Sequence, residues 1–369
     1  METVKVPFYA KASLIFIGFF AFISMLYVGQ RIIVPVIYAT ILAIVLSPLV
    51  DFLVGKKMNR VLAITLSLTL VLGIIILFVL FFSSQMSLFT ESFPKLVDKF
   101  YDTLQRSVAW VSANFNISTQ KINTFITNTK TAMLSSTSSS IGVTLTTMGG
   151  ALVILVLIPV YVFMILFYQP LLLDFIRRLF GKENHKEVNE VLVSTKTIVR
   201  KYLVALLLEA AIIATLNSVG LLIIGIDYAI VLGVIGALLN IIPYIGGIIA
   251  VALPMMVAIS TKSSSTYALL VLIVYIIIQF IDNHYIIPKI VASKVRINAL
   301  ISIIVVLVFG ALWGIPGMFL SIPLTAIIKV IFDHIDTLKP WGFLLGDTMP
   351  PIAIFKIKIK KKASKYANA

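Results

Sequence analysis

Cysteine is missing from this 369-residue sequence, which excludes disulfides, cysteine-ligated zinc or iron–sulfur sites and cysteine nucleophiles. The chain also lacks HExxH, GxSxG, a Walker A loop and a GxGxxG in a strand–helix context. We therefore predict no enzyme, no metal site and no organic cofactor. Without a nucleotide-binding motif the chain cannot hydrolyse ATP, so any transport would be passive or driven by an ion such as Na⁺ or H⁺.

Charge is also scarce. Only 12% of the residues are charged, whereas 60% are hydrophobic, and the mean hydropathy is +1.08. Soluble domains contain about 25% charged and roughly 45–50% apolar residues. A soluble fold could not cover this much apolar surface with so few charged residues. The sequence therefore predicts an integral membrane protein.

Acidic residues are half as frequent as basic ones, and the formal net charge is +15. The basic residues gather between apolar segments, chiefly in 55–60 and 177–201, so membrane topology explains them better than a nucleic-acid partner. By the positive-inside rule, the N-terminus, the 55–60 loop and the 170–201 segment face the cytoplasm. The basic C-terminal tail, 331–369, is expected there too, in contact with membrane lipids.

Six apolar runs have the length of about 20 residues that a bilayer core demands. We expect a multi-pass protein of the cytoplasmic (inner) membrane with spans at 13–29, 32–50, 61–82, 148–168, 202–224 and 267–288. The first run lacks a signal-peptide cleavage site, so it is expected to be a retained span. The expected divisions are three N-terminal transmembrane helices (1–82), an outer segment (83–147), a fourth span with a cytoplasmic helix (148–201), a transport core (202–330) and the basic tail (331–369).

The outer segment, 83–147, is rich in Ser, Thr and Asn. Apolar residues recur at three- and four-residue steps from Phe93 to Val111, which predicts an amphipathic helix. A second, weaker helix is expected around 117–133. We interpret this segment as an arm that rests on the membrane or on a neighbouring subunit.

Two longer apolar stretches, 228–260 and 299–330, are each interrupted in the middle by glycine and proline. Each half is too short to cross a bilayer, at about 20 Å of helix, which predicts two re-entrant helical hairpins. The expected hinge residues are Pro243, Gly246 and Gly247 in the first hairpin, and Gly310, Gly314, Pro316, Gly317 and Pro323 in the second.

The two interrupted stretches resemble each other. GALLNIIP starts at Gly236 and GALWGIP at Gly310, an offset of 74 (310 − 236), and the acids Glu209 and Asp282 are offset by 73 (282 − 209). These matches predict that a unit of span plus hairpin occurs twice, entering from opposite sides as an inverted repeat. Paired interrupted helices of this kind point to the binding site of a secondary transporter.

Acids within membrane spans are functional candidates by default, because burying charge in hydrocarbon is costly. Asp282, Asn283 and His284 together could bind a cation or accept a proton, or they could cap and pair with nearby backbone or Lys289. Glu209 has no basic neighbour in sequence, so it must be protonated, paired at a distance or facing water. Asn240 could face a cavity or satisfy backbone freed by Pro243, and His284 could relay protons or simply be hydrogen-bonded.

Three stretches resemble the autoinducer-2 exporter family, also described as a permease family. They are IGIDYAIVLGVIGALLNIIPYIGGIIA (224–250), QFIDNHYIIPKI (279–290) and GALWGIPGMFLSIPLTAIIK (310–329). The family's acid–Asn and Pro–Lys pattern is matched by Asp282, Asn283, Pro288 and Lys289, with Asp where Glu is common. Asn298 departs from the pattern, since the family often has proline there.

The resemblance implies an all-α inner-membrane transporter that is homo-oligomeric, with a pentamer as one arrangement. Members of the family are associated with autoinducer-2 export and others with sodium/proton antiport, so it does not fix the substrate of this chain. Two alternatives stay open: a passive oligomeric channel for ions or small solutes, and a structural or lipid-handling membrane protein.

Overall fold

The computed structural model describes residues 7–115, 156–242, 246–262, 264, 266–291 and 295–348. All regular structure in these residues is helical. The long helices are α1 (Phe8–Val28), α2 (Gln30–Gly55), α3 (Arg60–Phe115), α6 (His185–Ile224), α9 (Thr266–Ile281) and α10 (Ala299–His334). Shorter ones are Val156–Phe167, α5 (Gln169–Leu179), η1 (Lys182–Asn184), α7 (Ala229–Asn240), α8 (Gly246–Thr261), η2 (Asp282–Val291), η4 (Asp336–Leu338) and α11 (Lys339–Leu345).

Six of the described helices are long and apolar enough to cross a membrane: α1, α2, α3, α6, the stretch Thr266–Ile290 and α10. A further pair, Val156–Phe167 and α5, passes the same test together but is bent by 64°. These features are those of a polytopic membrane protein, which confirms the membrane class predicted from composition. Helix boundaries differ from the predicted spans at several places, because tertiary packing extends the helices beyond their apolar cores.

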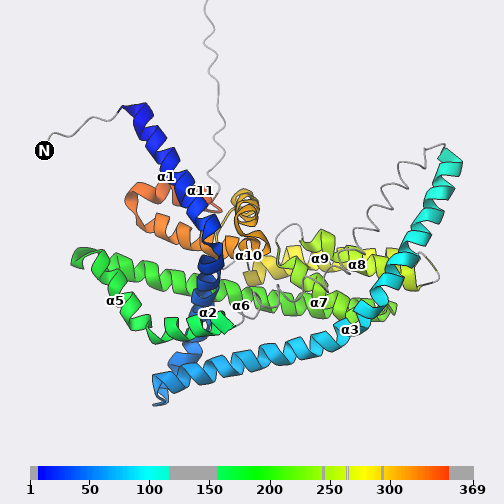
Figure 1. Ribbon diagram of the computed structural model, residues 1–369, viewed down its shortest axis with the longest axis horizontal. Helices are drawn as coiled ribbons and strands as arrows, with labels where there is room; N and C mark the ends of the chain where they lie inside the picture. The colour runs from blue at the N-terminus through cyan, green and yellow to red at the C-terminus, as the bar shows by residue number, and fades with distance from the viewer. Residues whose placement is uncertain are drawn as a thin grey trace, which may run out of the picture.

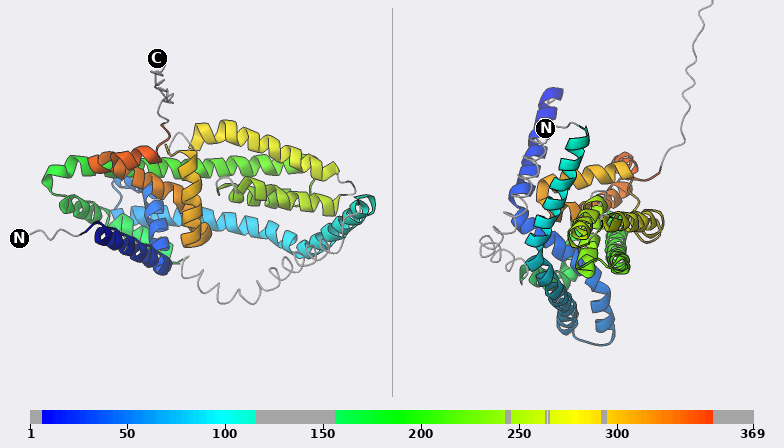
Figure 2. Two further views of the ribbon diagram at one scale, coloured as in Figure 1. Left: turned by 90° about the horizontal axis from the view of Figure 1, so that it is seen from above. Right: turned by 90° about the vertical axis from the view of Figure 1, so that its right-hand side faces the viewer.

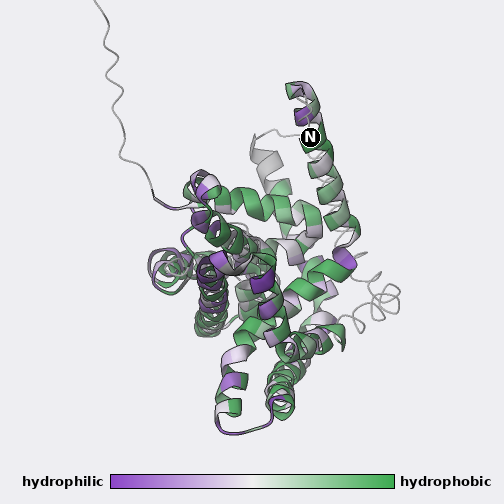
Figure 3. Ribbon diagram, turned by 90° about the vertical axis from the view of Figure 1, so that its left-hand side faces the viewer, coloured by the Kyte–Doolittle hydropathy of each residue, from purple (hydrophilic) through white to green (hydrophobic). Residues whose placement is uncertain are grey.

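The helices form an elongated bundle (Figure 1). The helices α3, α6, α7, α8 and α9 run along its long axis, and α1 and α2 cross them near one end (Figures 1 and 2). Hydrophobic residues make up much of each long helix (Figure 3), and many large apolar side chains are exposed. Helix α1 buries none of its side chains within the described chain, which is the exposure expected of a helix that faces lipid or another subunit.

Helix α3 is 56 residues long and continues past the predicted end of the third span at residue 82. The helix predicted at 93–111 is present, but it is the C-terminal part of α3 rather than a separate arm. Its apolar face packs on the same chain: Val97 and Tyr101 are buried against Met256 of α8. The hydroxyl of Ser260 donates to the Leu96 carbonyl at 2.7 Å. The second predicted helix, 117–133, lies outside the described residues.

A similar continuity appears in α6, which runs through 40 residues from His185 to Ile224. The predicted boundary at 201 between a cytoplasmic helix and the fifth span therefore falls inside one continuous helix, and the division itself stays a prediction. Its first part packs with α2 and α10 around Leu203 and Leu206. Its last part packs with α3, α7, α8 and α9 around Leu221. The middle of α6 thus lies where the two clusters meet.

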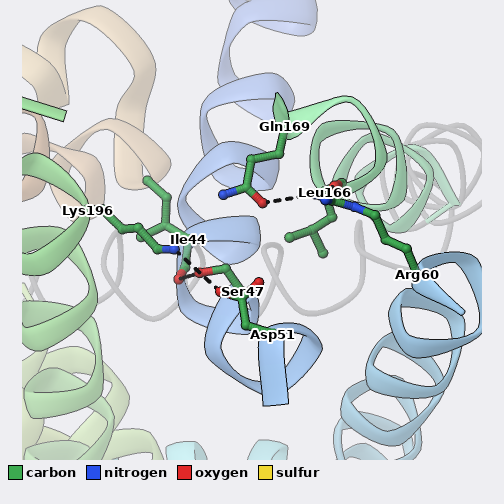
Figure 4. A network of polar contacts seen from close by, with 7 residues as sticks. All are labelled: Ile44, Ser47, Asp51, Arg60, Leu166, Gln169 and Lys196. Atoms are coloured by element: carbon green, nitrogen blue, oxygen red, sulfur yellow. Dashed lines mark hydrogen bonds and ion pairs between the residues drawn. The ribbon is translucent and has the colours of Figure 1, made fainter. Parts of the chain in front are cut away.

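Polar contacts join the start of α3 to the bent pair, Val156–Phe167 and α5 (Figure 4). The guanidinium of Arg60 donates to the Leu166 carbonyl at 2.7 Å and to the Gln169 side-chain oxygen at 3.3 Å. Nearby, Lys196 of α6 lies 3.8 Å from the carboxylate of Asp51 on α2. These contacts fix α2, α3, α6 and the bent pair relative to one another at this end of the bundle.

Asn298 joins two elements at the start of α10. Its side-chain oxygen accepts from the backbone amide of Ile301 at 2.9 Å. Its amide nitrogen donates to the carbonyls of Leu344 at 2.7 Å and Gly346 at 3.0 Å. The family departure noted at this position therefore has a structural reason, since proline has no side chain that could make these bonds.

Replacing Asn298 with alanine removes a helix cap and leaves two carbonyls without a donor. We expect the free energy of unfolding to fall by about 2 kcal/mol, as measured by thermal melting of the purified protein. Asn184→Ala is the matched control, because that exposed side chain makes a single bond, to Phe180. Equal melting temperatures for the two variants would contradict the junction described for Asn298.

Candidate functional site

A cavity of about 840 Å³ lies in the C-terminal half of the described chain. It is enclosed by α6, the facing ends of α7 and α8, the α9–η2 junction and parts of 295–302 and α10. Its polar lining residues are Tyr202, Glu209, Asn240, Tyr275, Gln279, Asn283 and Ser302. None of the described lining residues is Lys, Arg or His. The cavity is therefore chemically suited to cations and neutral polar solutes and unfavourable for anions.

Asp282 lies beside this cavity and is 0% exposed. One carboxylate oxygen, Oδ2, accepts from the amide of Asn240 at 2.8 Å, and the amide of Gln279 lies 3.5 Å away. The other oxygen, Oδ1, has no hydrogen-bond partner among the described residues. Unpartnered buried acceptors are rare because each costs about 1–3 kcal/mol, so this oxygen is available to a proton, a cation or a donor.

Glu209 supplies a second buried acid from the middle of α6. Its side chain is 6% exposed and lines the cavity. Neither Glu209 nor Asp282 forms an ion pair with a basic residue in the described ranges. Two acids without cationic partners around one cavity are unusual for a purely structural arrangement, because buried carboxylates are normally paired.

The backbone changes its winding at Asp282. The α-helix α9 ends at Ile281, and a π-helix, η2, follows from Asp282 to Val291. The predicted sixth span ends at residue 288, but the helix continues through Pro288 to Val291. Single π turns within helices are often found at functional sites.

The first interrupted stretch meets this junction. Helix α7 ends at Asn240 and α8 starts at Gly246, so the chain breaks where glycine and proline predicted; Pro243 lies outside the described residues. A Cβ on Gly246 would collide with the Leu239 carbonyl, and one on Gly247 would collide with the side-chain oxygen of Gln279. Both glycines therefore allow the turn to sit tightly against its own helix and against α9.

The second stretch breaks at Gly314, whose φ of 66° and ψ of −148° interrupt α10. Glycine is required here because other residues rarely adopt this conformation. Beyond the break, Gly317 lies against the Phe309 carbonyl. The two residues are eight positions apart, which would separate them by about 12 Å in a straight helix, so the chain folds back here. Gly310, which we expected to contribute to the break, lies within the helix and faces Met318. Pro323 is buried inside the second half.

The break in α10 contacts the N-terminal helices α1 and α2 rather than the cavity. The indole of Trp313 donates to the Leu26 carbonyl, and the Tyr38 hydroxyl donates to the Pro316 carbonyl, both at 3.1 Å. The two interrupted stretches therefore differ in surroundings: one lies against Asp282 and the other against α1 and α2.

The structure brings together most of the residues singled out from sequence. Glu209, Asn240 and Asn283 line the cavity, and Asp282 is bonded to Asn240. His284 does not join them: it is exposed, its Nδ1 lies 3.0 Å from the Phe280 carbonyl, and its ring stacks on Phe280. This geometry favours the simpler reading, a hydrogen-bonded histidine, over a proton relay.

Sequence reasoning missed Tyr275 and Gln279, which line the same cavity. Their spacing to Asp282, at steps of four and three residues, places all three on one face of a helix. That pattern was available in the sequence, but polar Gln and Tyr in an apolar run carry a weaker signal than an acid does.

Comparison with known proteins gives a consistent result. Residues 14–337 match the family described as "AI-2E family transporter". The chain is 25% identical to "AI-2 transport protein TqsA" of Escherichia coli (strain K12) over 322 residues, covering 86% of this chain and 90% of TqsA.

Shorter matches involve other membrane proteins. The chain is 33% identical over 129 residues to "Putative transport protein YueF" of Bacillus subtilis (strain 168), covering 35% of this chain and 34% of YueF. It is 26% identical over 213 residues to "Putative permease PerM" of E. coli (strain K12), covering 57% of this chain and 60% of PerM. The chain thus spans about a third of the length of YueF and somewhat under two thirds of that of PerM.

Proposed function

Because the chain belongs to the AI-2E family of transporters, a family of membrane transporters and not of enzymes, we propose that it is a cation-coupled secondary transporter. It exchanges Na⁺ for H⁺, or it uses such a gradient to export a small neutral solute of the autoinducer type. The observation that carries this proposal is the pair of buried acids, Glu209 and Asp282, around a cavity whose described lining lacks basic residues.

In this proposal the carboxylates of Asp282 and Glu209 hold the coupling cation or proton. Asn240 and Asn283 contribute amide oxygens and nitrogens to the same cavity. The unpartnered Oδ1 of Asp282 supports this role, since it lacks the donor or cation that a buried carboxylate oxygen requires.

We further propose that α7–α8 and the two halves of α10 are re-entrant hairpins that enter from opposite sides, the two halves of an inverted repeat within 202–330. Their helical breaks would place backbone groups at mid-depth, next to the substrate, as in other transporters with interrupted helices. Basic loops at 55–60 and 177–201 support cytoplasmic termini. The unburied length of α1 supports a homo-oligomer in contact with lipid.

The test is proton flux into proteoliposomes, read with a pH-sensitive dye, after a Na⁺ gradient is imposed. We expect flux that follows the Na⁺ gradient, reverses when the gradient is reversed and is absent from protein-free vesicles. If flux is absent although the protein is intact, Na⁺/H⁺ exchange is excluded, and counterflow of labelled neutral solutes tests the export branch.

The alternative is a passive channel, which the 840 Å³ cavity also accommodates. Planar-bilayer recording separates the two. Discrete unitary currents that persist without a Na⁺ or H⁺ gradient would establish a channel and overturn coupled transport. Their absence, together with gradient-driven flux, would establish the transporter.

A further inference from the structure

Two buried polar groups lie beyond the acids, at the interface of α6, α7 and α9. The side chain of Asn217 on α6 is 2% exposed, and that of Tyr275 on α9 is 7% exposed. The Asn217 oxygen, Oδ1, and the Tyr275 hydroxyl have no hydrogen-bond partner in the described part of the chain. Neither residue has been given a role in the exchange proposed above.

Both groups approach the same glycine. A Cβ on Gly236 of α7 would lie 3.1 Å from the Asn217 amide nitrogen and 3.2 Å from the Tyr275 hydroxyl oxygen. Glycine therefore keeps a small space beside the Tyr275 hydroxyl and the Asn217 amide, whose nitrogen faces Gly236. A half-turn about the terminal side-chain torsion of Asn217, which has a broad two-fold profile, would bring Oδ1 to the same place. Gly233, one turn earlier, lets α7 approach the Ser218 backbone in the same way, with a Cβ 2.6 Å from its nitrogen.

The unpartnered atoms share one chemical property. Three buried side-chain oxygens on α6, α9 and η2 lack a partner among the described residues: Asn217 Oδ1, Tyr275 Oη and Asp282 Oδ1. An amide oxygen and a carboxylate oxygen can only accept, so what they lack is a donor or a cation. Oxygen ligands of this kind suit hard cations.

The groups also form a continuous row with the cavity. Tyr275 and Gln279 follow one another on one face of α9, Asp282 continues the row at the start of η2, and the first two line the cavity. Tyr275 and Asp282 are seven residues apart, about 10 Å along the helix, and Glu209 and Asn217 are eight apart, about 12 Å along α6. The Asn217–Tyr275 pair is therefore one step further along the same helix interface from the two acids.

We propose that Asn217 and Tyr275, on either side of Gly236, form a second site for a monovalent cation, Na⁺. The ion then moves from this site to Asp282. This proposal rests on the proposed cation-coupled function, and it adds a binding site and an order of occupancy. The site at Asn217 and Tyr275 selects the ion with neutral oxygens, and the acidic site at Asp282 and Glu209 holds it with charge.

The first experiment measures binding without transport. The purified protein is melted in detergent with NaCl or with choline chloride at equal ionic strength. We expect Na⁺ to raise the wild-type melting temperature by several degrees, through preferential binding to the folded state. Asn217→Ala and Tyr275→Phe should lose most of this rise, and their melting temperatures in choline show whether they fold.

A third variant, Gly236→Ala, adds one methyl group without removing any oxygen. Because its Cβ lies beside both groups, it should reduce the Na⁺-dependent rise although alanine favours the helix. The matched control is Thr215→Val: its exposed hydroxyl bonds only within α6, to the Ala211 carbonyl at 2.8 Å, so the rise should be retained.

The second experiment measures the Na⁺ concentration that gives half-maximal proton flux. We expect this concentration to rise about tenfold in Asn217→Ala and Tyr275→Phe. Unchanged half-maximal concentrations and unchanged Na⁺-dependent melting in these variants would overturn the second site while leaving the proposed exchange intact. If the wild type shows no Na⁺-dependent proton flux, the proposed exchange is overturned. The melting experiment then tests independently whether Asn217 and Tyr275 bind Na⁺. A wild type that melts equally in NaCl and choline would exclude Na⁺ as its ligand.

Discussion

Replacing Asp282 with asparagine is expected to abolish cation-dependent flux while leaving the protein folded. The substitution keeps the size of the side chain and removes its charge. A contact to a charged group contributes up to about 3 kcal/mol, which corresponds to about 100-fold in rate. Stability should be unchanged or higher, because the variant no longer buries a carboxylate that is only half satisfied.

This combination of lost flux and retained stability distinguishes a functional acid from a structural one. Flux is measured in proteoliposomes and stability by melting of the same preparation. Asp227→Asn is the control, since that half-exposed carboxylate lies 3.8 Å from Lys262 in an ion pair outside the cavity. If Asp282→Asn melts several degrees lower and retains flux, the carboxylate has a structural role and the proposed function loses its main support.

Replacing Gly317 with alanine is expected to prevent correct folding of the second interrupted stretch. The added Cβ would collide with the Phe309 carbonyl oxygen and would lie 2.8 Å from its carbon and 2.9 Å from Cβ of Trp313. A backbone carbonyl cannot rotate away as a side chain can. We expect a loss of about 3 kcal/mol or more in the free energy of unfolding, at the upper end for overpacking.

The measurement is the yield of monodisperse protein and its melting temperature. Gly73→Ala is the control, because a Cβ on this α3 glycine meets nothing within 4 Å and alanine favours a helix by up to about 1 kcal/mol. Wild-type yield and melting for Gly317→Ala would mean that the two halves of α10 are not packed as tightly as described.

Composition and helix breakers predicted a large share of this architecture. The membrane class follows from hydropathy, because apolar runs of about 20 residues have few other uses. The two breaks follow from glycine and proline, whose backbone constraints are local and hence readable from sequence. Glu209 and Asn240 could be recognised as site candidates because polar groups in apolar runs are costly to bury.

Contacts between distant segments could not be predicted in the same way. The helix at 93–111 could be predicted from its apolar spacing, but its continuity with the third span and its packing against α8 could not. The role of Gly310 was overestimated because a glycine in an apolar run can mark either a break or a close contact, and here Met318 packs against it. Asn217 and Tyr275 meet only once three helices are assembled around Gly236.

The length of α3 has a mechanical consequence. Near its start, Ile64 is buried against α2 and Val162, and at Leu96 it is packed against the first interrupted stretch. About 48 Å of helix separates these two residues. A rod held at both ends acts as a lever, so a tilt of about 5° at its start would displace its far end by about 4 Å over that length. The part of α3 that precedes Pro94 therefore links the N-terminal helices to α7–α8 directly, so motion at one end can be transmitted to the other.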